Sequence, residues 1–177
     1  MKTFTILLSA AAFLSVILIG SVPGEERSMS DLSISSAAFS HNGMIPSKYT
    51  CDGANVNPPL SFANVPEKTA SLALIVDDPD APAGTWVHWV VWNIAAGAGQ
   101  IRENSVPQGA IQGTTDFRNQ KYGGPCPPSG THRYFFKLYA LDAPLPLKAG
   151  ATKTQVEQAM KGHILGQAER IGLYRRK

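Results

Sequence analysis

The sequence predicts a mainly β protein with an antiparallel, sandwich-like arrangement of strands. Short apolar runs rich in β-branched and aromatic residues are bounded by Gly and Pro. The segments between these runs lack a helical repeat, which argues against βαβ units. Gly and Pro account for 16 and 13 of the 177 residues, and only 16% of residues are charged. This composition favours a compact, turn-rich domain over a helical bundle.

Residues 1–22 have the pattern of an export signal. Lys2 precedes an uncharged stretch at residues 3–22, and charge returns at residues 25–27. No clean Ala-x-Ala site follows this stretch, so an uncleaved membrane anchor stays open beside a cleaved leader. Residues 23–30 are expected to form a polar spacer, and residues 31–177 a single domain. We therefore expect an exported protein, located in the periplasm or secreted.

Three strands are predicted, at residues 72–76, 86–94 and 134–141. The first is a continuous apolar run, as expected for a strand buried on both faces. Period-2 alternation in the second strand places its even-numbered residues on one face: Trp86, His88, Val90 and Trp92. Weaker alternation predicts a last strand at residues 169–174.

One or two short helices are expected near the C-terminus, and one of them can be placed. Thr154 and Glu157 form a capping-box pattern at its start. Val156 and Met160 follow the spacing of a buried helix face, and Gly162 can end the helix.

Charge and glycine spacing argue against several functions. The net charge of +3 is too small for a nucleic-acid binder that relies on phosphate neutralisation. Residues 97–99 lack the third glycine of a dinucleotide fingerprint, and residues 150–154 lack the spacing of a P-loop. The basic residues 175–177 are expected to form a solvated tail.

Cys51 and Cys126 are the two cysteines of the chain. In an exported protein, an even number of cysteines favours a disulfide. The alternative is two free thiols, one of which is reactive.

Candidate chemistry is concentrated in three segments. Residues 78–82, Asp-Pro-Asp-Ala-Pro, hold two carboxylates in a rigid loop after a buried strand. His88 lies among tryptophans, and His132 shares a strand face with Tyr134. Residues 123–130 are rich in Gly and Pro, which permits close approach of a ligand. Taken singly, these residues are also compatible with an ordinary Asp turn and with hydrogen-bonded core histidines.

Together these segments resemble the two signature regions of the phosphatidylethanolamine-binding protein family, the family of Raf kinase inhibitor protein. The matching stretches are Asp78-Pro-Asp-Ala-Pro82, Trp86-Val-His-Trp89 and Gly130-Thr-His-Arg-Tyr134. Residues 49–53, 58–60 and 122–129 resemble the bacterial branch in addition. The resemblance implies an antiparallel β-sandwich with Greek-key connections and a small pocket for anions such as a phosphate head group.

The resemblance also implies roles for individual residues. The polar pocket residues are expected to be Asp78, His88, His132 and Tyr134. The pocket walls are expected to be Ala81, Pro82, Trp86, Gly124, Pro127 and Pro128, with Asp80 as a buttress. Imidazole and phenol groups can donate to phosphate or carboxylate oxygens, whereas Asp78 can orient a histidine or accept from an ammonium group.

The implied function is a non-catalytic binding protein without a cofactor or a metal. Its expected partners are a small anion or phospholipid head group and, by family analogy alone, a protease or kinase that it inhibits. A homodimer stays open. Residues 83–85 form a much shorter connection than in the animal proteins, so inhibition of Raf kinase should not be transferred.

Two other site chemistries compete with the binding pocket. A hydrolase would use Cys126 or Ser129 with His132 and Asp78, although no G-x-S-x-G elbow is present. A metal site would use Asp78, Asp80, His88 and His132, although no close ligand pair such as H-E-x-x-H supports it. His41 and His163 are expected to be surface or structural residues.

Overall fold

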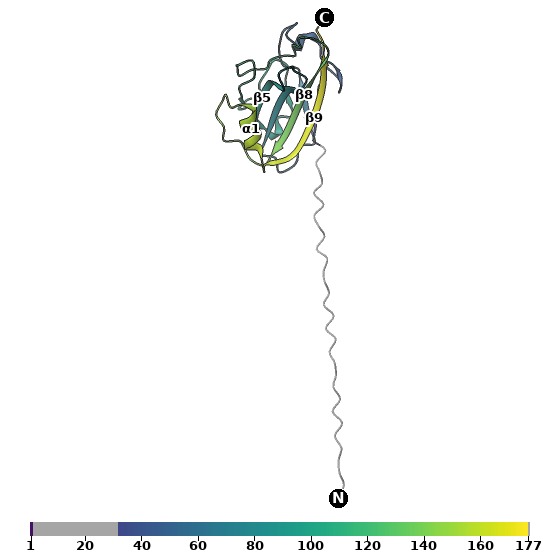
Figure 1. Ribbon diagram of the computed structural model, residues 1–177. Helices are drawn as coiled ribbons and strands as arrows, with labels where there is room; N and C mark the ends of the chain where they lie inside the picture. Colours follow the sequence, from purple (N-terminus) through teal and green to yellow (C-terminus); the bar gives the residue numbers. More distant parts are fainter. Residues whose placement is uncertain (2–31, 177) are drawn as a thin grey trace.

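The computed structural model describes residues 1 and 32–176, and it is mainly β with two sheets and one α-helix (Figure 1). The leader and spacer predicted at residues 1–22 and 23–30 fall, apart from Met1, outside the described residues. The strands are β1 Ser33–Ser35, β2 Gly43–Met44, β3 Leu60–Ala63, β4 Ser71–Asp78, β5 Trp86–Ala95, β6 Gln100–Ile101, β7 Ile111–Gln112, β8 His132–Leu141 and β9 Ile164–Tyr174. The helices are α1 Lys153–Met160 and two 3₁₀ turns, Ser47–Tyr49 and Ala96–Ala98.

The larger sheet has six strands in the order β2-β9-β8-β4-β5-β7, and the smaller sheet has the order β1-β3-β6. The long strands β4, β5, β8 and β9 pair antiparallel, as predicted. The two-residue strand β2 differs, because it pairs parallel with the end of β9. The predicted mainly β fold is thus confirmed, with a parallel edge pair added to the large sheet.

The main apolar core lies between the two sheets. The face of β4 that points into it carries Leu72, Leu74 and Val76, and the facing small sheet contributes Ile34 and Leu60. Burial of this kind stabilises the fold by about 25 cal/mol per Å² of apolar surface removed from water. The core therefore fixes how the two sheets pack.

A second apolar cluster lies between the opposite face of the large sheet and α1. Val156 and Met160 of the helix pack there with Ile75 and Trp92. Figure 1 shows α1 beside β5 at this side of the sheet. Both strand faces of β4 are consequently buried, as its continuous apolar run predicted.

The predicted helix is present, but its predicted cap is wrong by two residues. Thr152 is the N-cap, and its hydroxyl accepts a hydrogen bond from the Gln155 backbone at 3.3 Å. The Gln155 side chain accepts from the Thr152 backbone at 2.8 Å, which completes the capping box. Glu157 instead forms an i,i+4 ion pair with Lys153 at 3.6 Å.

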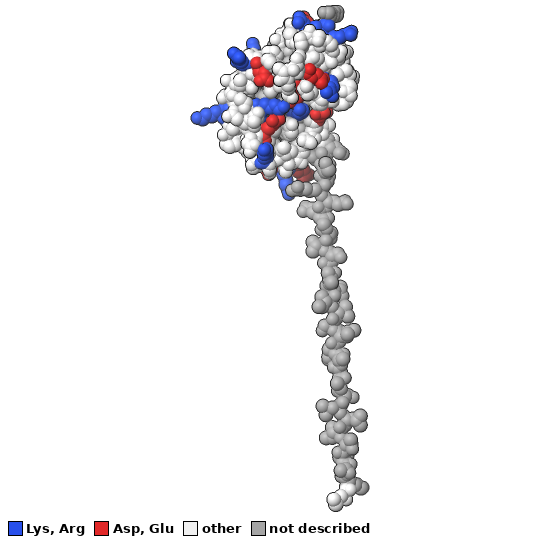
Figure 2. All heavy atoms as spheres, viewed as in Figure 1, with Lys and Arg blue, Asp and Glu red and all other residues white. Residues whose placement is uncertain are grey.

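The face in view in Figure 2 carries acidic and basic side chains interspersed, without a large area of one sign. Within the part of the chain that the structure describes, no helix has the length and apolarity needed to cross a membrane.

Candidate functional site

A cavity of about 450 Å³ opens where three strands of the large sheet meet at one edge. Asp78 ends β4, Trp86 begins the antiparallel neighbour β5, and His132 begins β8. Antiparallel pairing brings these strand ends together although they are far apart in the sequence. The lining residues are Asp78, Ala81, Pro82, Ala83, Trp86, His88, Phe117, Cys126, Pro127, Pro128 and His132.

A β-bulge in β5 aims His88 at this cavity. The register pairs Val76 with Trp89 but Asp77 with Val87, so His88 is an extra residue opposite β4. Val87 packs in the cluster beneath α1, whereas the His88 ring contacts Tyr134 on the other face. The prediction that His88 shares a face with Val90 and Trp92 is therefore wrong, because strict alternation does not hold across a bulge.

The His88 ring is buried and held at one nitrogen. Its Nδ1 lies 2.6 Å from the backbone carbonyl oxygen of Gly123. A carbonyl only accepts, so Nδ1 donates this hydrogen bond and Nε2 is left for a ligand. Burial lowers the pKa of His88, and this effect exceeds the opposing effects of the Gly123 carbonyl and of nearby carboxylates. His88 is thus a neutral imidazole near pH 7.

His132 is held by a carboxylate instead of a carbonyl. Its Nδ1 lies 2.7 Å from Oδ2 of Asp78, and both side chains are nearly buried. The other oxygen of Asp78, Oδ1, accepts a hydrogen bond from the Asp80 backbone at 2.8 Å. Asp78 therefore orients His132 and closes the turn at the end of β4. This contact leaves Nε2 of His132 as the ring nitrogen available to a ligand.

Asp80 lies beside the cavity and does not line it. Its two carboxylate oxygens accept from Nη2 and Nε of Arg133 at 2.7 and 2.9 Å. The backbone of Arg133 donates to Asp80 as well, at 2.9 Å. The Arg133 guanidinium holds the pKa of Asp80 at about 2. This bidentate pair joins the loop after β4 to the start of β8, which fits the buttress role that the resemblance implies.

Two of the predicted pocket residues also lie next to the cavity without lining it. Tyr134 is buried against His88, with ring centroids 5.2 Å apart and planes at 87°. Burial and the Asp78 charge both raise the pKa of its hydroxyl, so Tyr134 stays a neutral phenol. Gly124 faces the N-terminal segment, where a side chain would collide with Thr50. Tyr134 supports the His88 ring, and Gly124 lets the two segments approach.

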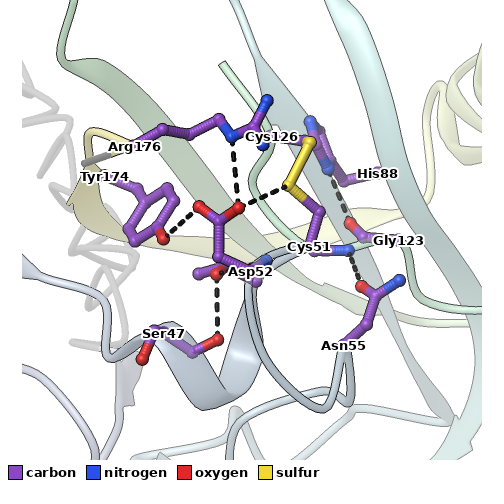
Figure 3. The surroundings of a disulfide bond; sticks show 11 residues. Ser47, Cys51, Asp52, Asn55, His88, Gly123, Cys126, Tyr174 and Arg176 are labelled. Carbon is purple, nitrogen blue, oxygen red and sulfur yellow. Dashed lines mark hydrogen bonds and ion pairs between the residues drawn. A yellow bond between two sulfur atoms is a disulfide. The ribbon is translucent and has the colours of Figure 1, made fainter. Parts of the chain in front are cut away.

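The disulfide joins Cys51 to Cys126 across 75 residues (Figure 3). It thereby holds the rim loop of the cavity, residues 123–130, of which Cys126, Pro127 and Pro128 line the cavity. Hydrogen bonds connect the same two segments, from Cys51 N to Pro125 O at 3.1 Å and from Gly124 N to Asn55 Oδ1 at 2.7 Å. Figure 3 shows the His88 ring and its bond to Gly123 next to this junction. The disulfide agrees with an oxidising compartment and so with the predicted export.

Sequence reasoning missed two lining residues, Ala83 and Phe117. Phe117 packs edge-on against Trp86 and His88, with centroid distances of 5.5 and 5.3 Å. It lies in a polar loop without periodicity, and Gly123 leaves room for its ring. Trp86 and Phe117 are both partly exposed and form an apolar rim. The polar floor of the cavity consists of Asp78, His88 and His132.

The two competing chemistries receive no support from this geometry. Cys126 is bonded to Cys51, which removes the thiolate that a cysteine nucleophile needs. Ser129 is exposed and is absent from the cavity lining. Within the described residues, no group of three or more His, Cys, Asp or Glu side chains is placed to hold a metal ion.

Comparison with known proteins identifies the family. The model of the phosphatidylethanolamine-binding protein family matches residues 35–175. A UPF0098 protein of Methanothermobacter thermautotrophicus is 53% identical over 150 residues, which is 82% of this chain and 99% of that protein. A corresponding UPF0098 protein of Aquifex aeolicus is 47% identical, covering 82% of this chain and 89% of the relative. The chain belongs to the phosphatidylethanolamine-binding protein family.

Solved structures agree with this assignment. A phosphatidylethanolamine-binding protein homolog from Chlamydia trachomatis superposes with a TM-score of 0.81 at 41% identity, covering 84% of this chain and 99% of that one. The E. coli protein YbcL, described as a member of the mammalian PEBP family, gives a TM-score of 0.78 at 31% identity. That match covers 82% of this chain and 99% of YbcL. The likeness therefore extends over nearly the whole described domain.

Proposed function

We propose that this protein is a non-catalytic binding protein whose pocket takes a small oxyanion, either free or as the phosphate of a phospholipid head group. The observation that carries the proposal is the presence of two imidazoles in one cavity, each bound by the protein at Nδ1. Both rings offer Nε2 to the same ligand. The names of the family and of the solved Chlamydia relative support a phospholipid head group as one source of the anion.

The apolar rim supports a ligand with an organic part. Trp86 and Phe117 surround the entrance together with Pro82 and Pro127. Such side chains contact alkyl or aromatic groups, while the histidines at the floor reach only the anionic end. A phosphate or carboxylate carrying an organic substituent satisfies both parts of the site.

Titration calorimetry on the full chain tests the proposal with phosphorylethanolamine, inorganic phosphate and acetate. We expect binding by the wild type and at least about tenfold weaker binding by His132→Ala and by Asp78→Ala, the equivalent of one lost charge-assisted hydrogen bond. His163 supplies a matched control, because its Nδ1 lies 2.7 Å from Asp142 in an exposed pair outside the cavity. His163→Ala should bind as the wild type does. A folded wild type that binds none of the three anions would refute the proposal and favour a protein-interaction role.

The non-catalytic part of the proposal has its own test. Incubation with activated phosphate and carboxylate esters, followed by mass spectrometry, should reveal no product and no covalent adduct. We expect this result because Cys126 is bonded to Cys51 in a disulfide and Ser129 is exposed. Turnover that is lost in His132→Ala would establish a hydrolase instead.

By family analogy, the proposal includes inhibition of a partner protease or kinase by this protein. The partly exposed Trp86 and Phe117 beside the anion pocket are the surface that such a partner would contact. Crosslinking from an introduced photoreactive residue at position 117 would identify a partner that contacts this rim. A crosslinked partner whose activity does not change on binding would exclude the inhibitory role.

A further inference from the structure

The two histidines of the pocket differ in the partner that holds Nδ1, and this difference restricts the ligand. The inference rests on the proposed anion pocket. At His88 the partner is the carbonyl oxygen of Gly123, at 2.6 Å. Since that carbonyl can only accept, the ring hydrogen of the neutral tautomer sits on Nδ1. Nε2 of His88 then carries a lone pair and acts as a hydrogen-bond acceptor.

At His132 the partner is the carboxylate of Asp78, at 2.7 Å. A carboxylate can form a charge-assisted hydrogen bond with an imidazolium, in which both ring nitrogens carry a hydrogen. Paired with Asp78 in this way, His132 donates from Nε2 to an oxyanion. One ring of the cavity therefore donates to the ligand, and the other ring accepts from it.

The surroundings of His88 maintain this division. The acidic groups near it are Asp77 and Asp78 of β4 and Asp116 of the loop before β8. Asp77 is fully buried on the other sheet face and bound by Lys137 and Lys153 at 2.9 and 2.6 Å.

Asp78 is committed to His132, and Asp116 accepts from the Val87 backbone at 2.7 Å. The remaining neighbours are the neutral rings of Tyr134 and Phe117. No carboxylate hydrogen-bonds to the His88 ring among the described residues, so burial keeps it neutral.

We propose that the pocket selects oxyanions that carry their own proton, such as hydrogen phosphate or a monoprotonated phosphate monoester. Such a ligand accepts from His132 through an unprotonated oxygen and donates its hydroxyl to His88. Sulfate has the same shape but no proton at neutral pH, so one of its oxygens would meet the lone pair of His88. A phosphate diester lacks the proton as well, unless its substituent supplies a donor such as an ammonium group.

Affinity measurements on the wild-type full chain test this proposal. At pH 6 we expect methyl phosphate to bind at least about tenfold more tightly than sulfate, the equivalent of one hydrogen bond gained and one repulsion avoided. Because the second pKa of a phosphate monoester is about 6, methyl phosphate loses its proton between pH 6 and pH 8, and this affinity ratio should fall to about one. Both anions contact His132 in the same way, so the ratio of their affinities isolates the contribution of His88. Dimethyl phosphate should bind weakly throughout, whereas phosphorylethanolamine at pH 8, where its phosphate has lost the proton, reports on an ammonium donor.

A variant at the accepting ring gives a second readout. His88→Gln places an amide near Nε2, and an amide can turn either its donor or its acceptor toward the ligand. The ratio of phosphate to sulfate affinity should therefore approach one in His88→Gln, while His163→Gln leaves it unchanged. If His88→Gln does not fold, the pH series on the wild type decides alone.

The possible outcomes separate this proposal from the one on which it rests. Equal affinity for methyl phosphate and sulfate at every pH would overturn the selection by proton content and leave the anion pocket intact. Absence of binding for all of these anions, by a folded protein, would overturn both proposals. Tight sulfate binding that is lost in His88→Gln would show that His88 donates, which contradicts a lone pair at Nε2 of His88.

Discussion

Removal of the disulfide should destabilise the protein strongly while leaving the pocket formed. The perturbation is the double substitution Cys51→Ala with Cys126→Ala, which avoids an unpaired thiol. The bond closes a loop of 75 residues. In the chain-entropy model, a loop of this length restricts the unfolded chain by about 4.5 kcal/mol at 25 °C. That is a large share of the roughly 5–15 kcal/mol by which native domains are stable.

The structure of the folded state should change little in this variant, because other contacts hold the same two segments together. Cys51 N donates to Pro125 O at 3.1 Å, and Gly124 N donates to Asn55 at 2.7 Å. The Tyr122 hydroxyl donates to the Tyr49 carbonyl at 3.0 Å. Since these hydrogen bonds keep the rim loop in place, we expect phosphate affinity within about threefold of the wild type, less than one hydrogen bond is worth.

Urea unfolding, followed by fluorescence of the three tryptophans, measures the effect. The midpoint should fall, and the slope m should rise because the unfolded chain exposes more surface. The melting temperature should fall by roughly 9–18 °C for a domain of this size. Tyr122→Phe is the control, as it removes one of the hydrogen bonds but keeps the disulfide, and should cost about 1 kcal/mol. A loss below about 2 kcal/mol in the double variant would refute the loop-entropy reasoning.

Three further predictions concern the fold around the pocket. The pKa of Asp80 is lowered from 3.8 to about 2, so its ion pair stabilises the protein above pH 4 and is lost as the pH falls toward 2. In urea titrations, the difference in unfolding free energy between wild type and Asp80→Asn should shrink over that range. A difference that stays constant with pH would contradict this. Gly172→Ala brings a methyl group within 2.6 Å of Ile45 and should cost about 1–3 kcal/mol of stability in thermal unfolding. The methyl group of Gly97→Ala meets nothing within 4 Å, so this variant should lose less stability than Gly172→Ala. Equal losses in the two variants would exclude a steric cause. Leu74→Ala opens a cavity between the sheets and should cost about 2–5 kcal/mol with no change in anion affinity, and a change in affinity would mean that the core and the pocket are coupled.

The sequence predicted the long strands because their signal is local. The apolar run of β4 and the aromatic and β-branched residues of β5 and β8 mark a strand without reference to its neighbours. The two-residue strands β2, β6 and β7 were not predicted, since pairing with distant residues is all that defines them. For α1, two capping-box patterns lie two residues apart, and the earlier one, Thr152 with Gln155, is the one that forms. Val156 and Met160 lie in the helix with either cap, so their spacing does not distinguish the two patterns.

The site was predictable to the extent that strand ends and Pro-containing loops mark it. Asp78, His88 and His132 all line the cavity. The facing of His88 was not predictable, because a bulge is set by the register of β5 against β4 and not by the residues at the bulge. Phe117 gave no local signal, since its place depends on contacts with Trp86 and on the space left by Gly123.

The bulge in β5 is what connects this fold to its proposed specificity. With regular alternation, His88 would share a face with Val90 and Trp92 and lie beneath α1, away from His132. The extra residue turns the ring to the pocket side, where the Gly123 carbonyl is the partner within reach at 2.6 Å. His132 meets a carboxylate because period-2 alternation sends Asp78 to the pocket and Asp77 to the lysines on the opposite face. In the proposed specificity, the protonation state of the preferred ligand therefore depends on strand register and on the groups that bind Nδ1 of each histidine. It does not depend only on the side chains that touch the ligand.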